Sequence, residues 1–181
     1  MLYRLHSSCC LFALVFLEDC KWKKLIAQLP RLSLYLREKA VMKFCILLTG
    51  LSGSGKTTLA KKIVYECGGT HFNADTVRAK HNDWDFSVGG RDRQVKRMVE
   101  LKERTEGLIV LDFICPKESS RKFINADLTI FLDTVTSSKY LDTDKVYEKP
   151  INPDIHLKEW SETEMVLSAI KKIELALKSK G

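Results

Sequence analysis

The stretch Gly50-Leu51-Ser52-Gly53-Ser54-Gly55-Lys56-Thr57 decides the fold, because it fits the pattern G-x-x-x-x-G-K-[ST] without a mismatch. The apolar residues 44–48 stand directly before it and predict a buried strand. Behind the loop, apolar residues recur at helical spacing and predict a helix: Leu59, Ala60, Ile63 and Val64. Two glycines, Gly68 and Gly69, are expected to end this helix. A strand, a glycine-rich loop and a helix in this order predict a phosphate-binding loop.

The residue types in this loop suit a nucleoside triphosphate. Glycines let backbone N–H groups turn inward around phosphate oxygens, and the helix that begins near Lys56 adds the positive end of its dipole. Lys56 is expected to reach the β- and γ-phosphates, and the Thr57 hydroxyl to ligate Mg²⁺. We therefore expect ATP and Mg²⁺ as cofactors. The expected ATP contacts are Gly50, Ser52, Gly53, Ser54, Gly55, Lys56, Thr57 and Thr58.

Length and composition predict one α/β domain. The chain has 181 residues, of which 45% are hydrophobic and 29% charged. Of the net charge of +7, residues 1–41 carry +4, and in the rest of the chain basic and acidic residues alternate. This distribution favours a small-molecule substrate over nucleic acid as partner. Six cysteines without a Cys-x-x-Cys pair argue against zinc, and free thiols suit the cytoplasm.

Residues 1–41 are interpreted as an N-terminal extension of doubtful role, and residues 42–181 as the P-loop domain. The apolar run at residues 9–17 is far shorter than the roughly 20 residues of a membrane-spanning helix, so no membrane association is expected. Met42 directly precedes the first predicted strand. An upstream translation and a dispensable extension are the two favoured interpretations, ahead of a cleaved targeting peptide.

Acidic residues follow each of the next predicted strands. Residues 70–74 end beside Asp75, residues 108–111 end at Asp112, and residues 128–132 end at Asp133. Ligands bind at the carboxyl ends of strands in open α/β sheets. Asp75 is expected to hold Mg²⁺ through water or to accept the proton of an attacking hydroxyl, with capping of the next helix as the alternative. Asp112 is either a metal-site residue or a structural hydrogen-bond acceptor.

Residues 91–104 are predicted to form a helix whose inner stripe carries Arg91 and Gln94 in its first turn. Arg91 is interpreted as an anion or ribose contact, or else as a snorkelling side chain. Trp84 and Phe86 lie in the irregular segment before this helix and can stack on a base. Alternating strands and helices predict a P-loop NTPase-type three-layer α/β/α fold with a mostly parallel sheet.

The last part of the domain is expected to hold a lid and a helix. Residues 134–158 show little periodicity and predict a mobile lid. Ser161-x-x-Glu164 predicts a capping box that opens a final helix. Its inward-facing residues are expected to be Met165, Val166, Ala169, Ile170, Ile173 and Leu177.

The order of these motifs resembles the adenylyl-sulfate kinase (APS kinase) family from about residue 43 to 155, with a shortened lid. The loop at residues 50–57 is similar to that family's Gly-Leu-Ser-Gly-Ser-Gly-Lys-Ser, and residues 73–78 to its Asp-Gly-Asp-Asn-Val-Arg. Residues 114–116 resemble its Ile-Ser-Pro. Asp144-x-x-Tyr147-Glu148-x-Pro150 resembles its motif near the end of the domain.

The resemblance implies a kinase that transfers the γ-phosphoryl group of ATP to the ribose 3′-hydroxyl of adenylyl sulfate, in sulfate assimilation. It implies Lys56 and Asp75 as catalytic residues and a possible homodimer. The substrate contacts that it implies are Arg78 and Arg91 for the phosphosulfate, Phe86 for the adenine, Gln94 and Ile114. The metal set is then Thr57, Asp75 and Asp112.

The sequence also departs from the family pattern. Asn73 replaces an Asp, and Asp112, where the family usually has a small residue, can supply the lost charge. Cys115 replaces the Ser of Ile-Ser-Pro. Glu118 stands near the position where the family pattern has an arginine that binds the anionic end of the substrate. An acidic side chain there is predicted to repel that end. In the shortened lid only Lys139 and Lys145 remain to contact phosphates.

Two other functions stay open at this point. One is a kinase for a different hydroxyl acceptor, such as a nucleoside, a nucleotide or the 5′-hydroxyl of a polynucleotide. The other is a nucleotide-binding relative without turnover, against which the presence of Lys56, Thr57 and Asp75 argues.

Overall fold

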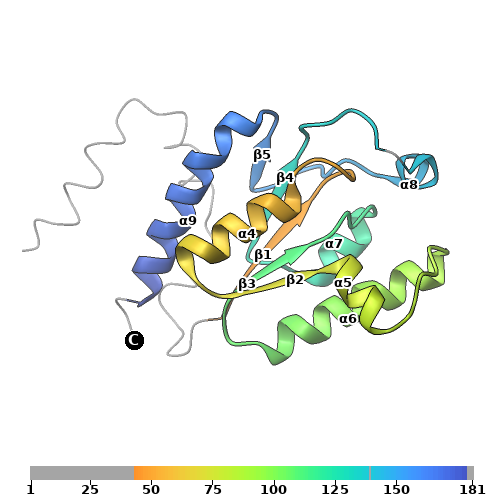
Figure 1. Cartoon of the computed structure of the whole chain (residues 1–181), viewed down its shortest axis with the longest axis horizontal. Helices are drawn as coiled ribbons and strands as arrows, with labels where there is room; N and C mark the ends of the chain where they lie inside the picture. The colour runs from red at the N-terminus through yellow and green to blue at the C-terminus, as the bar shows by residue number, and fades with distance from the viewer. Residues whose placement is uncertain (1–42, 139, 179–181) are drawn as a thin grey trace, which may run out of the picture.

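Strands and helices alternate along residues 43–138 and 140–178, the part of the chain that the computed structural model describes (Figure 1). The predictions for residues 1–41 and Lys139, and the inward orientation of the Leu177 side chain, lie outside what is described. In chain order the elements are β1 (Lys43–Thr49), α4 (Lys56–Cys67), β2 (Thr70–Asn73), α5 (Ala74–Lys80), α6 (Val88–Arg104), β3 (Gly107–Asp112), α7 (Glu118–Ile124), β4 (Leu128–Leu132), α8 (Leu141–Val146), β5 (Ile155–Leu157), the 3₁₀ turn η1 (Trp160–Glu162) and α9 (Thr163–Lys178).

The five strands form one sheet in the order β2-β3-β1-β4-β5, and every adjacent pair is parallel. β1 lies in the middle, so the loop that follows it opens at the centre of the carboxyl edge. In β2 and β3 the register places Asn73 directly beside Asp112. The carboxyl ends of all five strands therefore meet at the edge where the phosphate-binding loop begins.

Successive β1 side chains enter two different cores, as expected for a strand covered on both faces. Phe44, Ile46 and Leu48 are buried in a cluster with α4 and α9. Cys45 and Leu47 belong to a second cluster with α5, α6 and α7. Helices thus cover both faces of the sheet and make three layers, which confirms the predicted fold class.

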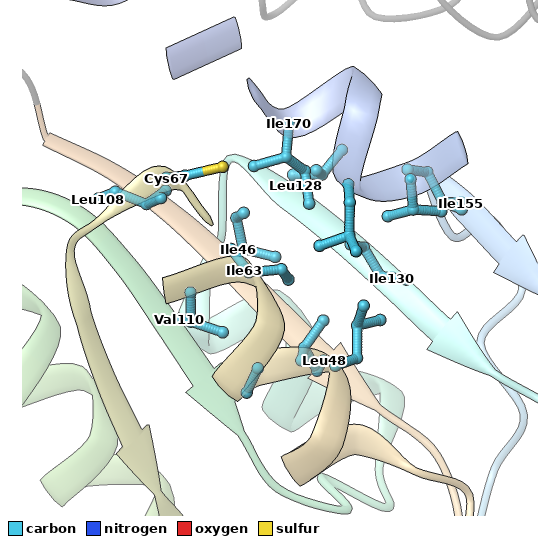
Figure 2. Packing of buried hydrophobic residues seen from close by; sticks show 14 of the residues in the cluster. Ile46, Leu48, Ile63, Cys67, Leu108, Val110, Leu128, Ile130, Ile155 and Ile170 are labelled. Carbon is cyan, nitrogen blue, oxygen red and sulfur yellow. The ribbon is translucent and has the colours of Figure 1, made fainter. Parts of the chain in front are cut away.

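Figure 2 shows the first of these clusters, in which Ile63 of α4 and Ile170 of α9 lie against the strands. Both side chains are at most 1% exposed. This packing fixes α4, and with it the first turn that carries Lys56, against the sheet.

The predicted strands agree with the structure to within about one residue at each end, and α6 begins three residues earlier than expected. Ser87 caps α6 by accepting a hydrogen bond from the Gly90 N–H at 3.2 Å. Residues 134–158, the predicted lid, contain α8 and β5, which the sequence pattern did not indicate. The predicted capping box was wrong: Glu159 and Glu162 form it, at η1.

Among its described side chains, the final helix has the predicted inner stripe with one exception. Val166 and Ile170 are buried, whereas Met165 is 45% exposed. Leu167 occupies the buried position instead. Within the two described ranges, no helix is both long and apolar enough to cross a membrane.

Candidate active site

The phosphate-binding loop turns through backbone conformations that favour glycine. Gly55 caps α4 with φ +90°, and a Cβ at this position would run into the ring of Trp160. Gly53 has the same φ of +90° with open space around it. The Thr134 hydroxyl donates to the Ser54 carbonyl at 2.8 Å and ties the loop to the segment after β4. The loop is therefore tied at Ser54 and closely covered by Trp160 at Gly55.

Lys56 is the buried cation of this loop, with 7% of its surface exposed. Its Nζ donates to the Leu51 carbonyl at 2.7 Å, inside the turn that phosphates are expected to occupy. Burial lowers the pKa of Lys56 to about 8, while the charges of Asp112 and Asp75 oppose this shift. Burial thus disfavours the charged ammonium, and the negative charge of a bound phosphate would offset this cost.

Asp112 is the centre of a hydrogen-bond network at the end of β3 and is only 1% exposed. Its Oδ2 accepts hydrogen bonds from Thr57 Oγ1 at 2.7 Å and Asn73 Nδ2 at 2.8 Å, and His71 Nε2 lies 3.2 Å away. Burial acts to raise the pKa of Asp112. The bonds from these three residues, together with the charge of Lys56, outweigh burial and bring the pKa below its ordinary value.

The donor set at Thr57 and Asp112 fits Mg²⁺. Hydroxyl and carboxylate oxygens are the ligands that a hard cation prefers, and Mg²⁺ commonly binds through one or two carboxylates together with substrate phosphates and water. Across the described residues, no group of three or more His, Cys, Asp or Glu side chains could hold a metal ion by itself. The site therefore suits an ion that is shared with the phosphates of a nucleotide.

Asp75 lies exposed in the first turn of α5. The alternative that it caps this helix was wrong, because Asn73 is the cap: its Oδ1 accepts from the Thr76 N–H at 3.0 Å. The Asp75 carboxylate is thereby left for other contacts, and its charge acts on Lys56.

One cavity of about 770 Å³ contains both halves of the predicted site. Gly50 and Ser54 do not line it; Gly50 lies against the Leu132 carbonyl, and Ser54 is buried. All other predicted site residues line it, namely Ser52, Gly53, Gly55, Lys56, Thr57, Thr58, Asp75, Arg78, Phe86, Arg91, Gln94, Asp112 and Ile114.

Phe86 is 46% exposed and lines the cavity, with two guanidinium groups near its ring. The guanidinium carbon of Arg78 lies 4.7 Å from the ring centroid and that of Arg91 lies 5.9 Å from it. Arg91 Nε also donates to the Phe86 carbonyl at 2.8 Å. The Arg91 side chain is 16% exposed and lines the cavity, so it does not extend into solvent.

Arg78 and Gln94 hold backbone segments in place. Arg78 is 4% exposed and donates to the carbonyls of Asp83, Asp85 and Gly90 at 2.9–3.3 Å. Gln94 is 2% exposed, and its Nε2 donates to the Ala74 carbonyl at 3.1 Å. Their predicted substrate contacts would be made in addition to these bonds.

The expected repulsion by Glu118 does not arise at the cavity. Glu118 does not line the cavity, and its Oε2 accepts from Arg121 Nε at 3.0 Å and NH2 at 2.8 Å. The neighbouring Lys117 lines it instead. Glu148 of the Tyr-Glu-x-Pro motif accepts from the Glu118 N–H at 2.8 Å, so this motif anchors the segment after α8 to α7.

Several residues of the site were missed from the sequence. Tyr140, Asp142 and Thr143 bring α8 to the cavity, and Arg91 NH2 lies 3.5 Å from Asp142 Oδ2. Their segment lacks a helical period, so only the fold reveals them. His71 was also missed, although its position two residues before Asn73 places both side chains on the same face of β2.

Comparison with known proteins agrees with this fold. A family model described as adenylylsulphate kinase matches residues 42–138, more than half of the chain. The Mycobacterium tuberculosis APS kinase CysC in complex with AMPPNP and APS is 20% identical with a TM-score of 0.57, over 74% of this chain and 98% of that one. Shikimate kinase from Aquifex aeolicus is 21% identical with a TM-score of 0.50, over 75% and 97%. The comparison with curated proteins gave no match.

Proposed function

Because the chain belongs to the adenylylsulphate kinase family, we propose that it transfers the γ-phosphoryl group of ATP to the ribose 3′-hydroxyl of adenylyl sulfate. By family and by fold it is a P-loop kinase. The observation that carries the proposal is the shared cavity, where Lys56 and Thr57 stand at one part of the lining and Phe86 and Arg91 at another, with Asp75 also in it.

The ATP half rests on the loop at residues 50–57. The Lys56 ammonium, now bound to the Leu51 carbonyl, is within the turn where β- and γ-phosphate oxygens would replace that partner. Backbone N–H groups at the start of α4 add donors to the same phosphates. When bound beside Thr57 and Asp112, Mg²⁺ would supply charge neutralisation on the β- and γ-phosphates.

Asp75 is the proposed proton acceptor. Its carboxylate takes the proton of the 3′-hydroxyl as the hydroxyl oxygen forms a bond to the γ-phosphorus, and the bond from that phosphorus to the bridging oxygen of ADP breaks. Asp75 lines the cavity and is not used as a helix cap, which supports this role. Lys56 stabilises the charge that spreads over the transferred oxygens.

The acceptor half is proposed to bind adenine on Phe86 and the phosphosulfate at Arg91 and Lys117. A half-exposed aromatic ring offers stacking area, and the bonds from Arg78 to the carbonyls around it hold the ring in position before substrate arrives. Gln94 and Ile114 are proposed further contacts. We also propose that the protein acts in sulfate assimilation in the cytoplasm; a homodimer stays a prediction from the sequence.

A kinase for another small hydroxyl acceptor is the second candidate. It is favoured by two observations at the acceptor half: Arg78 directs three hydrogen bonds to backbone carbonyls, and Asp142 lies beside Arg91. Both reduce the positive charge on offer to a dianionic acceptor. Phe86 would serve any nucleoside equally well.

The test is ADP release from Mg-ATP by the full chain, measured with and without adenylyl sulfate. Lys56→Ala provides the blank. Release that adenylyl sulfate stimulates, and that is lost in Lys56→Ala, supports the proposal. Stimulation only by other nucleosides or nucleotides would support the second candidate instead.

A further inference from the structure

His71 lies behind the metal-side carboxylate, outside the cavity lining, and no part of the proposed reaction uses it. Its Nε2 is 3.2 Å from Asp112 Oδ2, and its side chain is 17% exposed. Because the Asp112 carboxylate is ionised it can only accept hydrogen bonds, so the Nε2 of His71 carries the proton in this contact. Both the neutral ring protonated at Nε2 and the imidazolium provide that donor.

The pairing of β2 with β3 brings two donors to one oxygen. Asn73 lies beside Asp112 in register, and His71, two residues earlier on the same face of β2, lies beside Val110. The Asn73 amide is itself fixed, because its Oδ1 accepts from the Thr76 N–H and hydroxyl. With Thr57, three side chains address Oδ2 of Asp112, and none of these three bonds is made to Oδ1.

We propose that His71 is a positioning residue for the magnesium-nucleotide half of the site: with Asn73 it fixes the Asp112 carboxylate in the orientation that receives the Thr57 hydroxyl. The inference rests on the proposed function and deepens it. His71 acts through Asp112 and not on the substrate, because it does not line the cavity.

Without the His71 donor, the Asp112 carboxylate would be held less firmly. Asp112 is 1% exposed, so water replaces a lost partner poorly, and a carboxylate held by fewer bonds turns more easily about its side-chain torsions. The partners of metal-side groups commonly contribute about 10- to 100-fold to metal affinity. An apolar side chain at position 71 would leave Asp112 with the hydrogen bonds from Asn73 and Thr57 alone.

The experiment measures ATP binding by the full chain, once with Mg²⁺ and once with EDTA. His71→Phe removes the donor and keeps a ring, whereas His71→Gln keeps an N–H of similar reach. His81→Phe, at an exposed position after α5, is the matched control. The measured quantity is the ratio of ATP affinity with Mg²⁺ to ATP affinity with EDTA. We expect His71→Phe to lower this ratio about tenfold and to leave the affinity in EDTA unchanged. His71→Gln should recover most of the loss, and His81→Phe should behave as the unmodified chain.

Two results would overturn the inference. Unchanged Mg²⁺ dependence in His71→Phe would mean that Asp112 needs no help from position 71. An equal loss of ATP affinity with Mg²⁺ and with EDTA would mean that His71 contributes only to packing. If His71→Phe does not fold, His71→Gln is compared with His71→Asn, whose shorter amide should lose the Mg²⁺ gain; equal gains would again contradict the idea.

The proposed function can fail separately. Adenylyl sulfate takes no part in these binding measurements, so an unmodified chain that binds Mg-ATP but does not phosphorylate adenylyl sulfate would remove the proposed acceptor only. The result at His71 would stand unchanged.

Discussion

The Thr57 hydroxyl donates a hydrogen bond of 2.7 Å to Oδ2 of Asp112, which joins the first turn of α4 to the end of β3. Two residues on different elements, 55 positions apart in the chain, are thus joined at the place that we propose as the metal side of the site. Asn73 and His71 support the same oxygen from β2. The buried acid Asp112 thus lies at the end of β3, directly beside Asn73 of β2, the position where the family pattern has its first Asp.

Replacement of Asp112 by Asn should therefore impair the Mg²⁺-dependent reaction. We expect Asp112→Asn to lower the turnover of Mg-ATP by at least about tenfold, because the amide keeps the shape but loses the charge. Steady-state ADP release at several Mg²⁺ concentrations measures this. Asp133→Asn is the matched control, since Asp133 follows β4 at the same sheet edge but does not line the cavity. Equal activity of the two variants would contradict a metal-side role for Asp112.

Lys56 should give ATP binding a characteristic pH dependence. Burial lowers its pKa to about 8, so the ammonium is nearly complete below that pH and is lost above it. We expect affinity for ATP without Mg²⁺ to be constant near pH 7 and to weaken as the pH rises through about 8. A chain whose affinity is unchanged up to about pH 9.5 would contradict this expectation.

The free energy of unfolding of the ligand-free chain should increase with pH, whereas the affinity for ATP should decrease. The side chain of Lys56 has its ordinary pKa of 10.5 in the unfolded chain, whereas in the folded chain it releases its proton near pH 8. Between these values the unfolded state binds more protons, so the stability of the ligand-free chain rises with pH. Urea unfolding across this range measures the slope, and Lys56→Met, which has no ionisable group, should lose it.

The two glycines of the loop with φ +90° offer a direct comparison. Alanine costs about 1–2 kcal/mol in a left-handed conformation at either position. At Gly55 the added Cβ also runs into Trp160, whereas at Gly53 it meets nothing within 4 Å. We expect Gly55→Ala to lower the thermal unfolding temperature clearly more than Gly53→Ala. Equal shifts would show that Trp160 moves aside at little cost.

Phe86 should affect the acceptor and not ATP. Loss of one stacking ring costs about 1–3 kcal/mol, so Phe86→Ala should raise KM for adenylyl sulfate about fivefold or more and leave KM for ATP unchanged. Phe123→Ala removes a similarly exposed ring of α7 that does not line the cavity and serves as the control. A rise in both KM values would place Phe86 in the structure of the cavity as a whole.

Asp142 should compete with the acceptor for Arg91. The pair is 3.5 Å apart and the Asp142 side chain is 68% exposed, so Asp142→Asn should leave the unfolding temperature unchanged. Removing its charge should lower KM for adenylyl sulfate a few-fold, on the order of the roughly 0–1 kcal/mol of an exposed pair. Asp92→Asn, a second acid of the cavity lining, tests whether any lost negative charge has the same effect. If both variants lower KM equally, the specific competition is wrong.

Local patterns predicted the part of the fold that depends on neighbours in the chain. The loop at residues 50–57 and the strand ending at Asp112 have strong local signals, and the structure confirms both elements. α5 and α7 have seven residues each and α8 has six, too few for a helical period to be visible. β5 has only three residues and forms because β4 pairs with it.

The contacts of the candidate site depended on register, which no local pattern shows. The sequence identifies Asp112 as a possible metal residue, but only the pairing of β2 with β3 brings Asn73 and His71 to it. The expectation for Glu118 came from the family pattern, whereas within α7 its carboxylate pairs with Arg121, three residues further along the helix. Asp142 reaches Arg91 across 51 residues of chain.

The most direct test of the central claim is the transfer of labelled γ-phosphate from ATP to adenylyl sulfate by the full chain, with the 3′-deoxy analogue of adenylyl sulfate alongside. We expect a labelled product from adenylyl sulfate, none from the 3′-deoxy analogue and none from the Lys56→Ala chain. Binding of Mg-ATP without any label reaching adenylyl sulfate would contradict the proposed reaction and leave only the fold and the nucleotide half.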